Sequence, residues 1–470
     1  MLKGLEISEI TLSQAQQDNE VFRFDAEYFG KEALAVIARM QDYGPDVLSS
    51  IATITDGIHT SLPFVDDGDV KVLSAKHPKE NFIDRSLFET ISAAFHAKNP
   101  RTALRENDVL ISTVGTIGNS AVVTSDLLPA NSDRHIGIVR LHKGTVSPYF
   151  LSTFLLGRFG RVQTWRETTG NVQPNLFISK IGKLLLPRVS DNFEKTVTQC
   201  VIQAYQLRAE SGQNLEQTEA TLLRALGLED WKAPEPLSYV RSSRDAFGAG
   251  RLDAQYFHPA KTEALAKLNA LSNCTVGDCF NSVRELWQPD NDSGPHTVRN
   301  YDLTDALNPF LDGAKEPSHR TTIASTKKAI RGGDLVVSRL RSYLREIALV
   351  QPGDGLPMVA STEYIVLRPK QTGGVPVEAL MIFLRSALPQ LVFKWSQDGS
   401  AHPRFDEKEL LRLPLPDVLI QHSDDYVDAV RAVIAKRKRA TQLLNAAKRA
   451  VEIAIEQNEK AAMAYLESNA

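Results

Sequence analysis

Hydrophobic and polar positions follow the same succession of patterns twice along this chain. In each half a short helical pattern comes first, at residues 33–40 and 264–271, and a second closes the half, at 147–159 and 377–391. Between them lie short β-rich runs bounded by Gly, Asn and Asp, which predict strands. These runs are residues 70–73, 108–112, 121–123 and 136–141, then 334–338, 347–350 and 364–368. Each half therefore predicts a mixed α/β domain of the α+β class.

A long amphipathic helix is predicted after each domain, over about residues 192–226 and 424–466. Their apolar residues recur mostly at three-, four- and seven-residue spacings, and such a stripe needs an apolar cover. Two such helices can cover each other as an antiparallel pair, or each can pack only onto its own domain. Because Ser and Gly are weak helix formers, Ser211-Gly212 predicts a kink or break in the first helix.

Sequence motifs repeat in the same order in both halves. The pairs are Arg23-Phe24-Asp25-Ala26-Glu27-Tyr28-Phe29 with Arg251-Leu252-Asp253-Ala254-Gln255-Tyr256-Phe257, Asn107-Asp108-Val109-Leu110-Ile111-Ser112 with Gly333-Asp334-Leu335-Val336-Val337-Ser338, and Gly170-Asn171-Val172-Gln173-Pro174 with Gly399-Ser400-Ala401-His402-Pro403. The period is too long for a solenoid, so a whole domain is duplicated. The predicted divisions are 1–190, a first domain; 191–229, a central helix; 230–418, a linker and second domain; and 419–470, a C-terminal helix.

Composition excludes several classes of protein. The chain is 42% hydrophobic and 24% charged, as in ordinary globular proteins. Its net charge of −3 requires any polyanion binding to use local basic surfaces. No stretch approaches the roughly 20 apolar residues of a membrane span, and we expect a cytoplasmic location. The three cysteines are too few for a disulfide framework or a four-ligand zinc site, so Cys274 and Cys279 are interpreted as small apolar core residues.

Signatures of catalysis are weak. The sequence contains no phosphate-binding loop, no His-Glu-x-x-His and no metal-like spacing of histidines. One nuclease-like pattern remains, in which Asp46 and Asp69 could hold Mg²⁺ and Lys71 could orient water. The second half has no equivalent of this pattern. We therefore predict no catalytic or metal-binding residue in this chain and keep a Mg²⁺-dependent nuclease as an alternative.

Residues suited to nucleic-acid recognition gather around the predicted strand at residues 334–338 of the second half. Arg331, Arg339, Arg341 and Arg345 surround this strand and the loop after it, with Tyr343 among them. Arginine can contact guanine through two hydrogen bonds or pair with phosphate. The alternative is a solvated strand face with salt bridges.

The matched glycine loops carry different polar side chains. Candidate DNA contacts are Asn171, Gln173 and Asn175, with Arg166 upstream, in the first half, and His402 and Arg404, with Lys394 upstream, in the second. Asn and Gln can read adenine and Arg can read guanine, so two different base preferences are possible. A purely structural turn is the alternative. The basic run Lys436-Arg437-Lys438-Arg439 could touch a DNA backbone or form a solvated helix face.

In these motifs the chain resembles the specificity subunit of type I restriction-modification systems. The resemblance rests on Ile54-Thr55-Asp56-Gly57, on residues 108–112 with Gly115-Thr116-Ile117-Gly118, and on residues 169–173 leading to Leu184-Leu185-Leu186-Pro187. It departs in two places: the Pro-Pro-Leu-x-Glu-Gln pattern common after Pro187 is missing, and His402 stands where the family often has Gln.

The resemblance implies two tandem, pseudo-twofold-related target-recognition domains joined by two long antiparallel helices. It further implies a non-catalytic subunit that binds a split target in double-stranded DNA and recruits two modification subunits. Those subunits carry S-adenosylmethionine and methylate adenine, a restriction subunit can join them, and this chain holds no cofactor. The alternative outside the family is a scaffold whose duplicated domains bind two protein partners.

Overall fold

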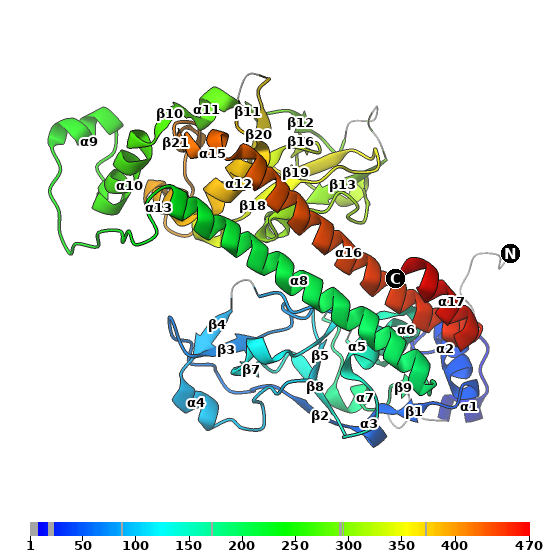
Figure 1. Cartoon of the computed structure of the whole chain (residues 1–470). Helices are drawn as coiled ribbons and strands as arrows, with labels where there is room; N and C mark the ends of the chain where they lie inside the picture. The colour runs from blue at the N-terminus through cyan, green and yellow to red at the C-terminus, as the bar shows by residue number, and fades with distance from the viewer. Residues whose placement is uncertain are drawn as a thin grey trace. The chain divides into compact units, whose positions relative to one another are not determined.

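The chain folds into two compact units. The computed structural model describes residues 8–16, 23–85, 88–170, 173–290, 294, 296–371 and 374–470 (Figure 1). The first unit comprises residues 1–209 and 437–470, and the second comprises residues 210–436. The division falls inside both long helices, so each unit contains part of each helix.

The first unit surrounds its sheets with short helices. Its helices are α1 (Leu12–Gln16), α2 (Lys31–Asp42), α3 (Leu48–Ile51), α4 (Ala93–Ala97), η1 (Ser125–Leu127), α5 (Pro148–Leu156), α6 (Arg158–Glu167), α7 (Ile178–Ile181) and α17 (Glu459–Asn469). Its strands are β1 (Asp46–Val47), β2 (Ala52–Asp56), β3 (Val70–Leu73), β4 (Glu89–Ile91), β5 (Val109–Ser112), β6 (Ser120–Val122), β7 (Ala130–Ser132), β8 (Ile136–Leu141) and β9 (Leu185–Leu186). They form sheets in the orders β2-β8-β5-β6, β4-β3-β7 and β1-β9.

The second unit has the same kind of construction. Its helices are α9 (Ser243–Ala249), η2 (Ala254–Phe257), α10 (Pro259–Ala270), α11 (Val276–Cys279), η3 (Leu303–Leu307), η4 (Arg320–Thr322), η5 (Ser342–Leu344), α12 (Val377–Arg385), α13 (Ala387–Ser396), α14 (Glu407–Leu411) and α15 (Val418–Gln421). Its strands are β10 (Ser272–Thr275), β11 (Phe280–Val283), β12 (Leu286–Trp287), β13 (Thr297–Tyr301), β14 (Phe310–Leu311), β15 (Ser318–His319), β16 (Lys327–Ile330), β17 (Leu335–Ser338), β18 (Ile347–Val350), β19 (Met358–Ser361), β20 (Tyr364–Pro369) and β21 (Pro414–Pro416).

Strand pairing shows the duplication directly. The antiparallel order β2-β8-β5-β6 of the first unit recurs as β11-β20-β17-β18 in the second. The parallel pair β3-β7 recurs as β13-β19, and the pair β1-β9 recurs as β10-β21. The second unit adds β14 to the sheet that contains β17, and β12 and β16 to the sheet that contains β13, so that each has five strands. The predicted mixed α/β class is confirmed.

The predicted strands agree with the observed ones to within a residue or two, but the predicted helices at 147–159 and 377–391 are each two helices. The first breaks at Gly157 and the second at Ser386, both in extended backbone. An added Cβ at Gly160 would lie 2.4 Å from the Phe154 carbonyl oxygen, so glycine permits the close return of α6 onto α5. At the matched position Pro389 lies in the first turn of α13, where proline is tolerated.

The long helices are α8 (Asp191–Ala225) and α16 (Ser423–Glu456). In the first unit the Cys200 thiol donates to the Leu443 carbonyl at 3.3 Å, and both helices contribute to one buried core. In the second unit Lys436 Nζ pairs with Glu210 at 2.6 Å, while Leu222 and Val430 share a core. Residue numbers fall along α16 as they rise along α8, so the predicted antiparallel pairing is confirmed within each unit.

Two details of the helix prediction are wrong. The predicted break is absent: the chain stays α-helical through Ser211 and Gly212, and Ser211 is buried, because packing outweighs weak intrinsic propensity. The C-terminal helix does not run unbroken to residue 466: α16 ends at Glu456 and α17 begins at Glu459. The Asn458 side chain accepts a hydrogen bond from the Ala461 amide at 2.9 Å, which caps α17.

Two further features concern the predicted core and the membrane. The Cys279 side chain is buried and its thiol lies 3.7 Å from that of Cys274, which is partly buried. Burial raises the pKa of the Cys279 thiol to about 11. Within the described ranges, no helix has the length and apolar character that crossing a bilayer requires.

Candidate nucleic-acid interface

Each unit brings three segments of chain together at the carboxyl end of one strand, β5 in the first unit and β17 in the second. In the first unit the Leu176 amide donates to the Thr113 carbonyl at 2.9 Å, and the Thr113 amide donates to the His135 carbonyl at 3.0 Å. In the second unit the Phe405 amide donates to the Arg339 carbonyl at 3.1 Å, and the Arg339 amide donates to the Glu363 backbone carbonyl at 3.2 Å. We call these surfaces the loop platforms: described residues 113, 133–135, 169–170 and 173–176 in the first unit, and residues 339–345, 361–363 and 398–405 in the second.

The described ends of the two glycine loops are closed by the same backbone hydrogen bonds. Thr169 and Asn175 exchange two backbone hydrogen bonds, of 3.0 and 2.8 Å, as do Asp398 and Arg404, of 2.7 and 2.9 Å. Gly170 has φ of +103° and Gly399 has φ of +93°, a region that side chains with a Cβ rarely adopt. These bonds and glycines fix the closing ends of the turn in both units, while the side chains at positions 173 and 175 differ from those at 402 and 404. Asn171 lies outside the described residues.

Side chains at matched positions of the two platforms are different. The same backbone hydrogen bond joins Thr113 to His135 in the first unit and Arg339 to Glu363 in the second. Thr113 therefore corresponds to Arg339, and His135 corresponds to Glu363. The glycine loops pair Gln173 with His402 and Asn175 with Arg404. At these four matched positions the first platform carries hydroxyl, imidazole and amide side chains, whereas the second carries two guanidinium groups, one carboxylate and one imidazole.

An ion cluster occupies the second platform. The Glu363 carboxylate accepts from Arg404 Nη2 at 2.8 Å and Nε at 3.0 Å, and from Arg339 Nε at 3.0 Å. These two arginines, Arg404 first, lower the pKa of Glu363 to about 2. Arg341 lies beside them, with Nη2 3.3 Å from Nδ1 of His402. The predicted candidates Arg339, Arg341, His402 and Arg404 therefore lie in one cluster.

The short helix η5 presents the remaining candidates of this unit. Tyr343 is 61% exposed on it, and Arg341 and Arg345, at its two ends, both have positive φ. Arg385 holds the far end in place, because its Nη1 donates to the carbonyls of Arg345 and Ile347 at 2.8 Å each. Arg331 lies at the opposite end of β17 and does not join the platform.

Two upstream candidates have different environments. The Arg166 guanidinium lies 3.7 Å over the Tyr28 ring, donates to the Tyr28 carbonyl at 3.1 Å, and is only 12% exposed. Its contacts are therefore interior ones, whereas the neighbouring Trp165 is 51% exposed. Lys394 is exposed, with Nζ 4.9 Å from the Trp395 ring, and that ring stacks on His258 at 3.8 Å.

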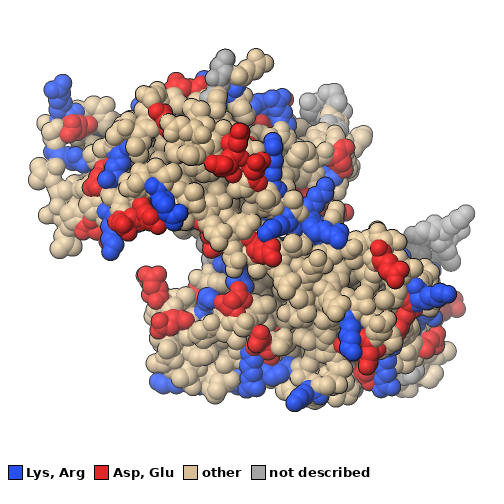
Figure 2. All heavy atoms as spheres, in the orientation of Figure 1, with Lys and Arg blue, Asp and Glu red and all other residues tan. Residues whose placement is uncertain are grey.

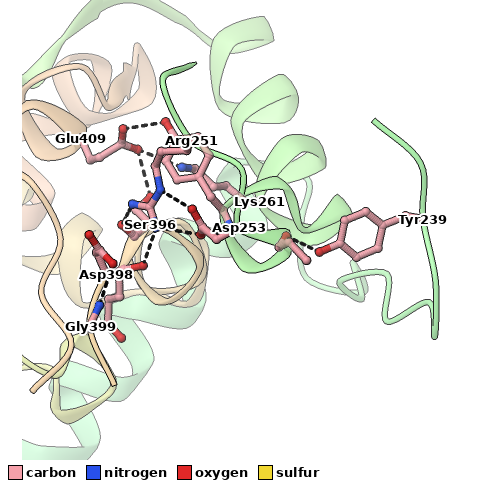
Figure 3. A network of polar contacts seen from close by, with 11 residues as sticks. Tyr239, Arg251, Asp253, Lys261, Ser396, Asp398, Gly399 and Glu409 are labelled. Atoms are coloured by element: carbon pink, nitrogen blue, oxygen red, sulfur yellow. Dashed lines mark hydrogen bonds and ion pairs between the residues drawn. The ribbon is translucent and has the colours of Figure 1, made fainter. Parts of the chain in front are cut away.

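The repeated Arg-x-Asp-Ala-x-Tyr-Phe motif supports the base of each glycine loop. Arg251 pairs with Asp253 at 2.7 Å and donates to the Ser396 and Gln397 carbonyls at 3.3 and 3.1 Å, at the end of α13 (Figure 3). Asp253 accepts the Tyr256 amide at 3.2 Å. The first unit repeats this: Arg23 pairs with Asp25 at 2.7 Å and donates to the Arg166 carbonyl at 3.0 Å.

A polar network in the second unit reinforces that support (Figure 3). Glu409 accepts from Lys261 and from the Ser396 hydroxyl, each at 3.0 Å, and from the Tyr256 hydroxyl at 3.0 Å. Burial and the Glu409 carboxylate raise the pKa of Tyr256 to about 12, so the phenol stays protonated and continues to donate. The helix end before residues 398–405 is thereby fixed.

Sequence reasoning missed three residues of the platforms: Thr113, His135 and Glu363. Each directly follows or precedes a matched strand, which is the signal that could have identified them. Thr113 follows β5 as Arg339 follows β17, and His135 precedes β8 as Glu363 precedes β20.

The nuclease pattern has other partners in the structure. Asp46 accepts from Arg188 Nε at 2.9 Å, and Lys71 Nζ donates to the Leu127 carbonyl at 3.2 Å. In the part of the chain that the structure describes, no group of three or more His, Cys, Asp or Glu side chains is placed to hold a metal ion.

Acidic and basic side chains are interspersed on the visible face of each unit (Figure 2).

Three solved structures are similar to this chain. The type I restriction-modification S subunit from M. genitalium is 12% identical, with a TM-score of 0.34, over 90% of this chain and 95% of that one. The HsdS subunit from Thermoanaerobacter tengcongensis is 14% identical, with a TM-score of 0.27, over 90% and 95%. A structure described as showing complex assembly and conformational transition of the type I R-M system is 14% identical, with a TM-score of 0.26, over 90% and 96%. No family model and no curated protein matches the chain.

Proposed function

We propose that this chain is the DNA-specificity subunit of a type I restriction-modification complex. It reads a two-part target in double-stranded DNA, one part with each loop platform, and catalyses nothing itself. Two modification subunits bind to it, carry S-adenosylmethionine and methylate adenine, and a restriction subunit can join the complex. In this proposal the protein acts in the cytoplasm, where it reaches the DNA.

One observation carries this proposal: the platforms have matched backbones and unmatched side chains. Thr113, His135 and Asn175 stand where Arg339, Glu363 and Arg404 stand in the other unit. Polar side chains at a loop edge can read base edges through hydrogen bonds, and different side chains read different bases. A duplication that preserves the shared strand order and changes the platform side chains suits a target with two unlike halves.

The long helices suit the spacing of such a target. The 35 residues of α8 correspond to about 52 Å at 1.5 Å per residue. Major grooves on one face of DNA recur about every 34 Å. In this proposal the paired helices α8 and α16 set the number of base pairs between the two half-sites.

Methylome sequencing of the host with and without this gene tests the proposal. We expect a split adenine-methylated motif that disappears on deletion and returns when the gene is restored. Binding of the purified complex to a duplex carrying that motif should weaken steeply with salt, since phosphate contacts release counterions. An unchanged methylome after deletion, with two protein partners bound and no duplex, would instead indicate the scaffold.

A further inference from the structure

Arg339 is held differently from the other arginine of the Glu363 cluster. Arg404 uses both Nε and Nη2 on the carboxylate and gives Nη1 to the His402 carbonyl at 3.0 Å. Arg339 uses only Nε. Considering only the residues that the structure describes, no group bonds Nη1 or Nη2 of Arg339, and its side chain is 43% exposed. Its two-nitrogen edge therefore remains available.

Backbone and side-chain contacts together fix the direction of this edge. The Arg339 amide donates to the Glu363 backbone carbonyl, and the Arg339 carbonyl accepts from the Phe405 amide. The segments 361–363 and 398–405 therefore both fix the backbone position of Arg339. The Glu363 carboxylate then restrains the guanidinium through Nε. An arginine held in this way has less side-chain entropy to lose on binding than a free one.

The chemistry of the edge suits guanine better than phosphate. Guanine offers two acceptors, O6 and N7, at the spacing of the arginine fork. The Glu363 carboxylate offsets one of the two guanidinium charges of Arg339 and Arg404, so these two arginines attract a phosphate less than two unpaired arginines would. Three arginine hydrogen bonds occupy most of the roughly four acceptor positions of the Glu363 carboxylate, which leaves little of it to accept from the amino group of cytosine.

The first platform lacks this arrangement. Thr113 and His135 stand at the positions of Arg339 and Glu363, and the His135 ring lies 3.3 Å from Asp133. A threonine hydroxyl cannot form the two-nitrogen fork. At these matched positions the two-nitrogen fork therefore occurs in the second unit and not in the first.

We propose that Arg339 reads a guanine in the half-site recognised by the second unit, and that Glu363 is the positioning residue that aims it. This inference rests on the proposed function. The other cluster member, Arg404, secures Glu363 rather than contacting the base.

The test is methylome sequencing of hosts that carry R339K, E363Q or H135A in place of the natural gene. R339K keeps the charge and loses the fork, so one G·C position of one half-site should become degenerate, with discrimination falling roughly 5- to 100-fold. E363Q should lower the same discrimination. It should also strengthen binding of the purified complex to a non-target duplex at low salt, because two guanidinium groups lose their counter-charge. H135A should alter only the other half-site.

Several results would overturn the inference while leaving the proposed function intact. A split motif that keeps its guanine preference in R339K removes the role of Arg339. An even loss of affinity for every sequence in R339A, restored in R339K, would show a phosphate contact. E363Q with unchanged discrimination and unchanged non-target binding would make Glu363 a structural residue only. Thermal unfolding of each purified variant controls for misfolding. A methylome that does not depend on the gene would instead refute the proposed function.

Discussion

Asp108 and Asp334 are buried at matched positions, each 1% exposed, and each is neutralised by an arginine on the neighbouring strand. Arg140 bonds Asp108 at 2.8 and 2.7 Å, and Arg368 bonds Asp334 at 2.7 and 2.7 Å. The second carboxylate also accepts the Arg331 amide at 2.9 Å, which closes the turn before β17. These aspartates recur in both halves because they fix the strand that leads to each platform.

We expect D334N to destabilise the second unit by about 3 kcal/mol, because it leaves the Arg368 guanidinium without its charge partner. Urea unfolding followed by tryptophan fluorescence measures this, since Trp231, Trp287 and Trp395 lie in that unit. The exposed pair Arg224–Glu229 of the same unit supplies the control, and E229Q should cost about 1 kcal/mol or less. Equal effects of the two substitutions would contradict the role assigned to Asp334.

At the scale of elements, hydrophobic period predicted strands better than helix ends. Strands β3, β8 and β18 match their predicted ranges, because short apolar runs bounded by turn residues are typical of strands. Helix breaks depended on contacts that no local pattern contains: Gly160 permits the return of α6, and packing keeps α8 helical through Gly212.

The antiparallel pairing of α8 and α16 leads to a prediction about spacing. Glu210 and Lys436 face each other across the pair. Four residues inserted after 209 and four after 436 should keep the pairing and lengthen both helices by about 6 Å. We expect the spacer of the methylated motif to grow by about two base pairs with both half-sites unchanged.

Methylome sequencing measures that change. The control is the same insertion in α8 alone, which displaces the pairing and should reduce methylation of every site. Altered half-sites with an unchanged spacer would show that the helices do not set the spacing.

At the scale of the whole molecule, the chain consists of two copies of one scaffold with different platforms. The scaffold contacts of the repeated motif use backbone acceptors: Arg23 donates to the Arg166 carbonyl and Arg251 to the Ser396 carbonyl. A backbone carbonyl is present whatever the side chain. The scaffold therefore tolerates sequence change in the segments that it supports.

Exchange of residues 41–186 for the matching segment of another such protein should change one half-site only. The exchanged segment contains Thr113, His135 and Asn175, while the Arg23–Asp25 pair remains to support the new loop. The methylated motif of the hybrid is the measurement, with the unexchanged chain as its control. A change in both half-sites would contradict the independence of the two platforms.

The sequence by itself determined the duplication, the mixed α/β class, most strands and the two long helices, because periodicity and repeated motifs are local properties. It also identified Arg339, Arg341, His402 and Arg404 as recognition candidates by residue type. Only the tertiary structure brought these four together, added Glu363 from a different turn, and turned Arg166 toward Tyr28. Which nitrogen of an arginine is occupied depends on contacts between segments far apart in the chain, and no pattern of neighbouring residues contains that information.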